Sequence, residues 1–116
     1  MRTAAQARAA LENSAPLFAA LGDATRLKLV TRLCDGGPQS IARLTDGLNL
    51  TRQGITKHLR VLAAAGLVHG SRTGRESRWQ VDPRWLEIAR RYLDLISERW
   101  DTRLKALERY VEKFGC

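Results

Sequence analysis

The chain has 116 residues, of which 44% are hydrophobic, which is enough for one domain with a core and too few for two. No apolar run reaches the roughly 18 residues that a membrane-spanning helix needs, and the first ten residues lack the apolar block of a signal peptide. We therefore expect a soluble, cytoplasmic protein in which the distant Cys34 and Cys116 are reduced. The net charge of +8 favours a polyanionic partner.

The chain opens with an alanine-rich segment that is predicted to be helical to about Glu12. Ser14 is predicted to cap a second helix, in which Pro16 falls in the first turn, where its missing N–H costs nothing. This second helix should end near Leu21. Residues 1–21 are thus predicted to form two short helices.

Asp23 is predicted to cap the next helix, which Gly36 and the following Gly-Pro pair should end. The apolar positions that recur along it at helical spacing are Leu27, Val30, Leu33 and Cys34. Cys34 is either a redox sensor or a small apolar side chain of the core, and the second role is the commoner one for a buried helical cysteine.

Two further helices with a tight turn between them are predicted at residues 40–46 and 51–65. Ile41, Leu44 and Leu48 should face inward, and Asn49 tolerates the left-handed backbone that a tight turn needs. Thr51 is the predicted cap of the second helix, and Gly66 its terminator.

The second of these helices has one apolar and one basic face. Ile55, Leu59 and Leu62 form the apolar face, whereas the opposite face carries Arg52, Gln53, Thr56, Lys57 and Arg60. A merely solvated face usually mixes both signs of charge. The stretch from Thr51 to Gly74 has no acidic residue, which favours contact with a polyanion.

A basic hairpin follows, with strands at residues 67–73 and 75–81 about a Thr73-Gly74 turn. Trp79 and Val81 should share one face, and the hairpin carries Arg72, Arg75 and Arg78. Residues 51–78 hold six basic residues against one acidic residue, so most of the excess charge lies in this central stretch.

The final segment is predicted to be one long amphipathic helix that begins at Asp82-Pro83 and runs to about residue 114. Its large apolar residues exceed what one small domain can hide on a single helix face, so we expect a homodimer. The candidate interface residues, shared with the first helix, are Trp85, Tyr92, Trp100 and Leu104.

This order of elements is that of a winged helix-turn-helix, mainly α with a small β-hairpin. We expect a single domain over residues 1–116, with the helix-turn-helix at about 40–65, the wing at about 67–81 and a C-terminal dimerisation helix at about 83–114. The second helix of such a motif fits the major groove of double-stranded DNA, and an arginine-tipped wing reaches nearby phosphates or the minor groove. The predicted DNA-binding residues are Thr51, Arg52, Gln53, Thr56, Lys57, Arg60, Arg72, Arg75 and Arg78.

Three segments in order resemble the ArsR family of bacterial winged-helix repressors: LFAALGDATRL at 17–27, LTRQGITKHLRVL at 50–62 and AGLV at 65–68. The tail ISERWDTRL at 96–104 is similar to members that often lack a metal site. The resemblance implies a homodimer that binds a two-fold symmetric operator and blocks transcription.

Neither metal site of the family has its ligands in this sequence. Residues 41–44 read IARL where metal sensors carry Cys-x-Cys, and the final helix has no histidine for zinc. We therefore expect no metal and no cofactor. The only histidines are His58 and His69, and His58 is either a pH switch, a phosphate contact or a packed residue with one hydrogen bond.

Two other classes of function are alternatives to a repressor. No nucleophile-histidine set, paired acids or glycine-rich phosphate loop is present, so we do not expect an enzyme. A protein-protein adaptor or an RNA-binding module would share the winged-helix fold without needing operator symmetry.

Overall fold

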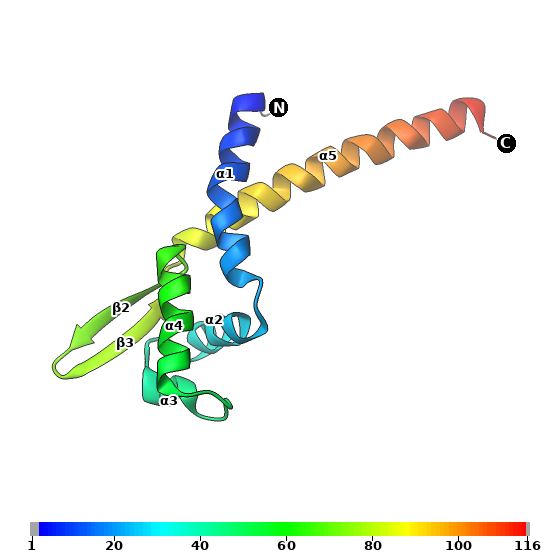
Figure 1. Ribbon diagram of the computed structural model, residues 1–116. Coiled ribbons are helices and arrows are strands. Elements are labelled where there is room, and N and C mark those ends of the chain that lie inside the picture. Colours follow the sequence, from blue (N-terminus) through cyan, green and yellow to red (C-terminus); the bar gives the residue numbers. More distant parts are fainter. Residues whose placement is uncertain (1–2, 116) are drawn as a thin grey trace.

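The computed structural model describes residues 3–115 (Figure 1). The order of its elements is α1 (Ala4–Leu21), α2 (Ala24–Gly36), β1 (Gln39–Ser40), α3 (Ile41–Thr45), α4 (Arg52–Ala64), β2 (Val68–Thr73), β3 (Glu76–Val81) and α5 (Arg84–Phe114). This is the predicted winged helix-turn-helix with a long final helix. In the part of the chain described, no helix is long and apolar enough to cross a membrane.

Residues 4–21 form one helix, so the prediction of two was wrong. Thr3 begins it with a capping box, in which its hydroxyl accepts from the backbone N–H of Gln6 and the Gln6 side chain accepts from the N–H of Thr3. The helix continues through Pro16 because Ser14, Leu17 and other residues of the same face are buried against the rest of the chain. Packing of that face outweighs the one backbone hydrogen bond that a proline removes.

The buried face of α2 differs from the prediction by part of a turn. Leu29, Val30 and Leu33 are buried, whereas Leu27 is 48% exposed and Cys34 is exposed. The expected position of Cys34 in the core was therefore wrong. The spacing of apolar residues allowed either face, and packing against α1 and α4 selected the one with Leu29.

The core lies where α2, α3 and α4 meet the start of the hairpin and of α5. Its fully buried residues are Leu29, Leu44, Ile55, Leu59, Leu62 and Leu67. The predicted apolar face of α4 is confirmed, because Ile55, Leu59 and Leu62 all have an exposed fraction of zero. Burial of this face makes the opposite face of α4 the outer surface of the domain.

The predicted hairpin belongs to a three-stranded antiparallel sheet in the order β1-β3-β2. The additional strand β1 pairs Gln39 with Trp79 and Ser40 with Arg78. A two-residue strand has too little periodicity to be predicted from the sequence. It joins the base of the wing to the segment that leads into α3.

Side-chain caps begin α2 and α4 at the predicted residues Asp23 and Thr51, and Ser40 caps α3 in the same way. Asp23, Ser40 and Thr51 each accept a hydrogen bond from the backbone N–H three residues on. The left-handed residue between α3 and α4 is Gly47, with φ of 75°, and not Asn49. Glycine adopts this backbone without a Cβ penalty, so the turn uses it in preference to asparagine.

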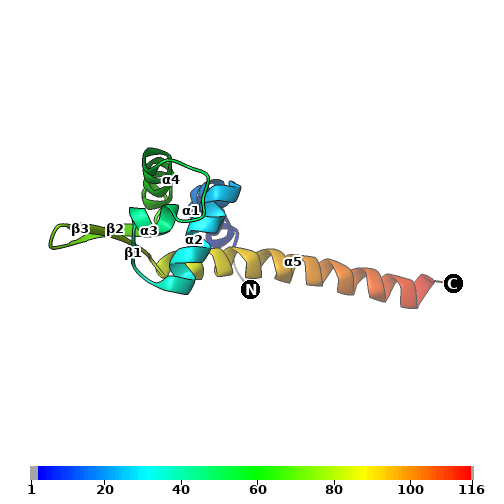
Figure 2. The ribbon, with the colours of Figure 1, turned by 90° about the horizontal axis from the view of Figure 1, so that it is seen from below.

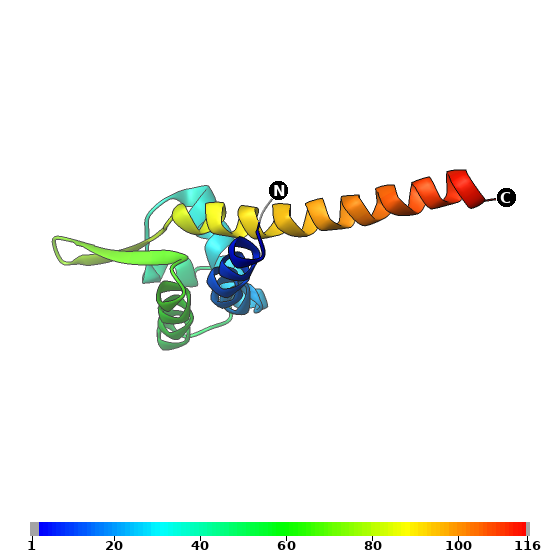
Figure 3. The ribbon, with the colours of Figure 1, turned by 90° about the horizontal axis from the view of Figure 1, so that it is seen from above.

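The wing and the distal half of α5 project from opposite sides of the helical body (Figures 2 and 3). As a result the chain is elongated, with extents of 68 × 31 × 20 Å. The first turns of α5 pack on α1, whereas residues 96–114 are exposed. The long predicted helix is thus confirmed, and more than half of its residues are exposed.

Candidate nucleic-acid interface

Helix α4 presents the predicted polar face to solvent. Arg52, Gln53, Lys57 and Arg60 are exposed on it, held outward by the burial of Ile55, Leu59 and Leu62 on the opposite face. Their side chains make no hydrogen bond or ion pair in the structure of residues 3–115, so their donors face water. Such donors are able to bond base edges and phosphates.

The two threonines of this face use their hydroxyl groups within the helix. Oγ1 of Thr51 accepts from the N–H of Gly54 at 3.0 Å, and Oγ1 of Thr56 donates to the carbonyl oxygen of Arg52 at 2.8 Å. Thr51 therefore still offers its hydroxyl proton to a partner, whereas Thr56 offers lone pairs and a methyl group. Of the uncharged side chains Gln53 and Thr56 on this face, Gln53 alone keeps both a donor and an acceptor unused.

The three arginines of the wing lie on its two faces and at its tip. The turn is Gly74-Arg75 and not Thr73-Gly74, since Thr73 pairs with Glu76. Gly74 has φ of 64° at the first central position, as two-residue hairpin turns with a glycine there require. Arg75 thus lies at the exposed tip.

The other two wing arginines lie on opposite faces of the hairpin. Arg72 is two residues from Gly70 along β2, so both lie on the same face of the hairpin. Trp79 pairs with Gly70 and therefore shares this face with Arg72. Arg78 is on the other face, where its Nε and Nη2 donate to one carboxylate oxygen of Glu76 at 3.1 and 3.0 Å. Glu76 therefore neutralises part of the positive charge that Arg78 brings to the wing.

His58 of α4 is half-buried and connected to α2. Its Nδ1 lies 3.3 Å from Nη1 of Arg26 and 3.9 Å from the carboxylate of Asp23. Arg26 also donates through Nε to the carbonyl oxygen of Ala20, at the end of α1. The backbone N–H of Arg26 lowers the pKa of Asp23, which keeps its carboxylate charged beside His58. The network joins α4 to α2 and α1.

Asp82 and Arg84 stabilise the junction between the wing and α5. Arg84 donates to both carboxylate oxygens of Asp82, and the backbone N–H of Arg84 donates to one of them. These hydrogen bonds lower the pKa of Asp82 to about 2. The backbone of Asp82 is fixed in turn by its N–H, which donates to the carbonyl oxygen of Leu67 at 2.9 Å.

The four predicted interface residues are in different environments. Trp85 is only 9% exposed and belongs to the core of its own chain, so its apolar surface is already covered. Tyr92 is half-buried, with its ring 5.7 Å from that of Phe18 in α1. Trp100 and Leu104 are 59% and 39% exposed. Only these last two present large apolar surfaces to a partner.

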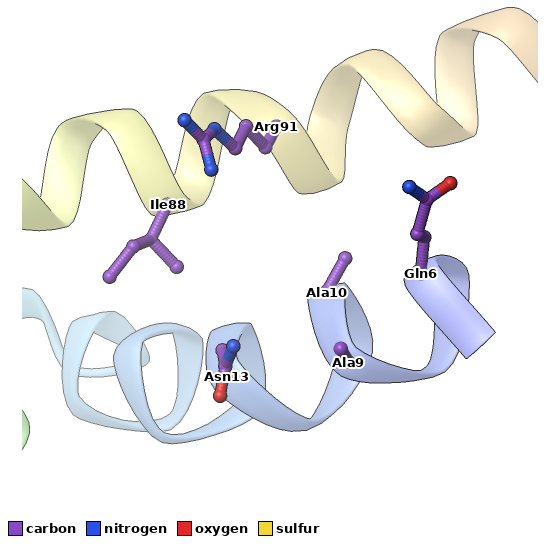
Figure 4. Close-up of a pocket in the computed structure, with 6 residues that line it drawn as sticks. All are labelled: Gln6, Ala9, Ala10, Asn13, Ile88 and Arg91. Atoms are coloured by element: carbon purple, nitrogen blue, oxygen red, sulfur yellow. The ribbon is translucent and has the colours of Figure 1, made fainter. Parts of the chain in front are cut away.

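A pocket of about 390 Å³ separates the N-terminal half of α1 from α5 (Figure 4). Ile88 points from α5 into the gap, and Gln6 and Ala10 point into it from α1. A second pocket, of about 310 Å³, has Leu11, Tyr92 and Ile96 among its lining residues. The two helices thus diverge and leave apolar surface between them.

The two candidate sensing residues lie on different helices, Cys34 exposed on α2 and His58 half-buried on α4. Cys116 lies outside the described residues. His69, on the outer face of the wing, has Nε2 of Gln80 within 3.1 Å of its ring. Within residues 3–115, no three side chains of histidine, cysteine, aspartate or glutamate come together as a metal site.

Comparison with known proteins gives a consistent result. A helix-turn-helix domain family matches residues 21–70. The ArsR-like transcriptional regulator from Rhodococcus sp. RHA1 has a solved structure that superposes with a TM-score of 0.74, at 39% identity over 84% of this chain and 92% of that one. The chain belongs to the ArsR family.

Two further regulators support this membership. The HTH-type transcriptional regulator Rv2034 of Mycobacterium tuberculosis is 32% identical over 83% of this chain and 86% of its own length. The regulator YuzN of Bacillus subtilis is 39% identical over 54% of this chain and 75% of its own length. This ArsR-family chain is accordingly a DNA-binding transcriptional regulator.

Proposed function

We propose that this ArsR-family protein is a homodimeric repressor that binds a two-fold symmetric operator in double-stranded DNA. The observation that carries the proposal is the exposed face of α4, where three basic residues and Gln53 form no ion pair within residues 3–115 and lie beside a basic wing. The α4 helices of two copies would enter successive major grooves of one duplex. Bound in this way, the dimer would block access of the transcription machinery to the operator.

Within each half-site, base reading and charge neutralisation would fall to different residues. Gln53, at the start of α4, would pair with a base edge because it keeps both a donor and an acceptor. Thr51 would donate its hydroxyl proton to a phosphate. Arg75 at the wing tip, together with Arg72, would supply attraction that does not depend on sequence. Arg78 would contribute less, since Glu76 already binds its guanidinium.

Binding titrations over a salt series, on the operator duplex and on random duplex, test this division. Gln53→Ala should weaken operator binding by about 1 to 3 kcal/mol and leave random DNA almost unaffected. Arg75→Ala should weaken both and lower the salt slope by about one unit for each lost phosphate contact, or about two per dimer. Indistinguishable losses on the two DNAs for both variants would contradict the division.

The homodimer would form through the exposed stripe of α5 and the diverging part of α1. Trp100, Leu104 and the residues beyond them on this stripe are not covered by their own chain, and the α1–α5 gap leaves Ile88 and Ile96 partly exposed. A second copy supplies a matching apolar surface by symmetry. Because Trp85 is already buried, it is left out of the proposed interface.

We further infer that the protein acts in the cytoplasm, where its proposed partner is chromosomal DNA. We also infer that it catalyses no reaction, as expected of a chain whose relatives are regulators.

A duplex with two half-sites should bind more tightly than a duplex with one. Single-stranded RNA of equal charge should compete weakly. If RNA bound as tightly as the two-site duplex, the alternative of an RNA-binding winged helix would replace the repressor.

A further inference from the structure

A side chain of α2 reaches the turn between α3 and α4. Nη1 of Arg32 donates to the carbonyl oxygen of Leu44 at 3.0 Å and to that of Asp46. Leu44 is in the last turn of α3, and Asp46 is the residue that ends this helix. One cationic group therefore binds two backbone carbonyls where α3 stops and the turn begins.

These carbonyls need a partner because a helix leaves its last carbonyl groups without intrahelical donors. Helix α3 has only five residues, so its own hydrogen bonds hold its end weakly. A guanidinium donor forms stronger, charge-assisted hydrogen bonds with carbonyl oxygens than a neutral donor does. Arg32 of α2 thus supplies the hydrogen-bond donor that the end of α3 lacks.

The turn itself is built closely around the same guanidinium. Gly47 follows Asp46 with φ of 75°, and a Cβ at this position would lie 3.4 Å from Nη2 of Arg32. The N–H of Leu48 then returns to the carbonyl oxygen of Thr45 at 3.0 Å. The path of residues 46–48 is therefore defined on one side by α3 and on the other by Arg32.

Arg32 is held at both its ends. Its own carbonyl oxygen accepts from Nε2 of Gln39 at 2.7 Å. Gln39 is 8% exposed and pairs in β1 with Trp79 of the wing strand β3. The backbone of Arg32 is thereby attached to the sheet while its side chain holds the turn. The arginine connects the wing to the helix-turn-helix.

We propose that Arg32 is a positioning residue for DNA recognition, which sets how α4 is presented to the major groove by fixing the turn that leads into it. The inference rests on the proposed function, in which Gln53 at the start of α4 reads bases. Base reading requires the side chain to be held close to its bonding geometry, whereas attraction to phosphates tolerates displacement. Loss of Arg32 should therefore reduce sequence discrimination more than affinity for DNA in general.

The test compares Arg32→Met with Lys28→Met in the full chain. Lys28 is exposed on the same helix one turn earlier, so its replacement removes the same charge without touching the turn. Binding is titrated over a salt series on random duplex and on a duplex selected from a random library by the wild type. Arg32→Met should weaken selected-duplex binding by roughly ten- to a hundredfold, which is the range for hydrogen bonds to a charged group. Its random-duplex affinity and salt slope should match those of Lys28→Met.

Two results would overturn the proposal. If Arg32→Met lost affinity equally on both duplexes and lowered the salt slope, Arg32 would be a phosphate contact. If it matched Lys28→Met on both, the turn would not need it. Should Arg32→Met fail to fold, Gly47→Ala strains the same turn from the other side and should reproduce the loss of discrimination.

Hydrogen exchange gives a readout that does not depend on DNA. Without the Arg32 contacts, the Leu48 amide should exchange faster relative to the amides of the middle of α4, whereas Lys28→Met should leave it unchanged. Unchanged Leu48 exchange in Arg32→Met would refute the positioning role. If the wild type selected no duplex, the proposed function would fail, and the exchange experiment would still decide whether Arg32 holds the turn.

Discussion

Replacing Trp100 by glutamate should convert the proposed homodimer into a monomer. Trp100 is 59% exposed on the distal half of α5. In a dimer joined through this stripe the indole would be buried against the second copy. The substitution removes that apolar surface and places a charge where an apolar neighbour is expected.

The size of the effect follows from the exposed fraction. A tryptophan buries about 150 to 250 Å² when fully covered, so a side chain that is 59% exposed offers roughly 90 to 150 Å². At about 25 cal/mol per Å² this is roughly 2 to 4 kcal/mol per copy, and a two-fold interface counts it twice. Even if the partner covers only half of this area, the loss is roughly 2 to 4 kcal/mol, or about a 30- to 1000-fold rise in Kd.

Sedimentation at low micromolar concentration measures this directly. The wild type should sediment at twice the chain mass of 13.0 kDa, and Trp100→Glu near the single-chain mass. Thr102→Glu is the matched control, because at about 100° per residue Thr102 lies on nearly the opposite side of the helix. A wild-type monomer, or equal dissociation by Thr102→Glu, would refute the interface.

The other predictions concern the core, the junction between the wing and α5, and metals. Leu59→Ala, at a fully buried position, should lower the free energy of unfolding in urea by about 2 to 5 kcal/mol. Val61→Ala, at a position that is 44% exposed on the same helix, should lower this free energy far less. Similar losses for the two variants would contradict the assigned core. Asp82 has a pKa of about 2 in the folded protein against 3.8 ordinarily, so its charge adds stability above about pH 4 that is lost as the pH falls toward 2. The difference in unfolding free energy between wild type and Asp82→Asn should therefore shrink over this range, and a constant difference would exclude the charged pair with Arg84 as its source. Zinc, cadmium or arsenite should leave operator affinity unchanged, and tight stoichiometric zinc binding by the reduced protein would show that prediction to be wrong.

Several contacts of the candidate site had no signal in the sequence. Arg26 and Arg32 are ordinary basic residues on a helix, but the first contacts His58, 32 positions away, and the second contacts Leu44, 12 positions away. Arg78 is a predicted DNA-binding residue of the wing, and the structure pairs its guanidinium with Glu76 on the same face of the strand. Partners of this kind depend on where each flexible side chain comes to lie after packing.

The winged helix-turn-helix and the basic face of α4 could be predicted from the amino-acid sequence, because both depend on local properties. The apolar repeat of Ile55, Leu59 and Leu62, the cap at Thr51 and the stop at Gly66 act within a few residues of one another. Tertiary structure decided the features for which local preferences were divided or opposed. Helix α1 continues through Pro16, α2 buries the face that contains Leu29 and leaves Cys34 exposed, and Trp85 is buried within its own chain. Burial of apolar surface against a neighbouring element outweighs the hydrogen bond that is lost at Pro16, and it selects one face where the sequence favours neither.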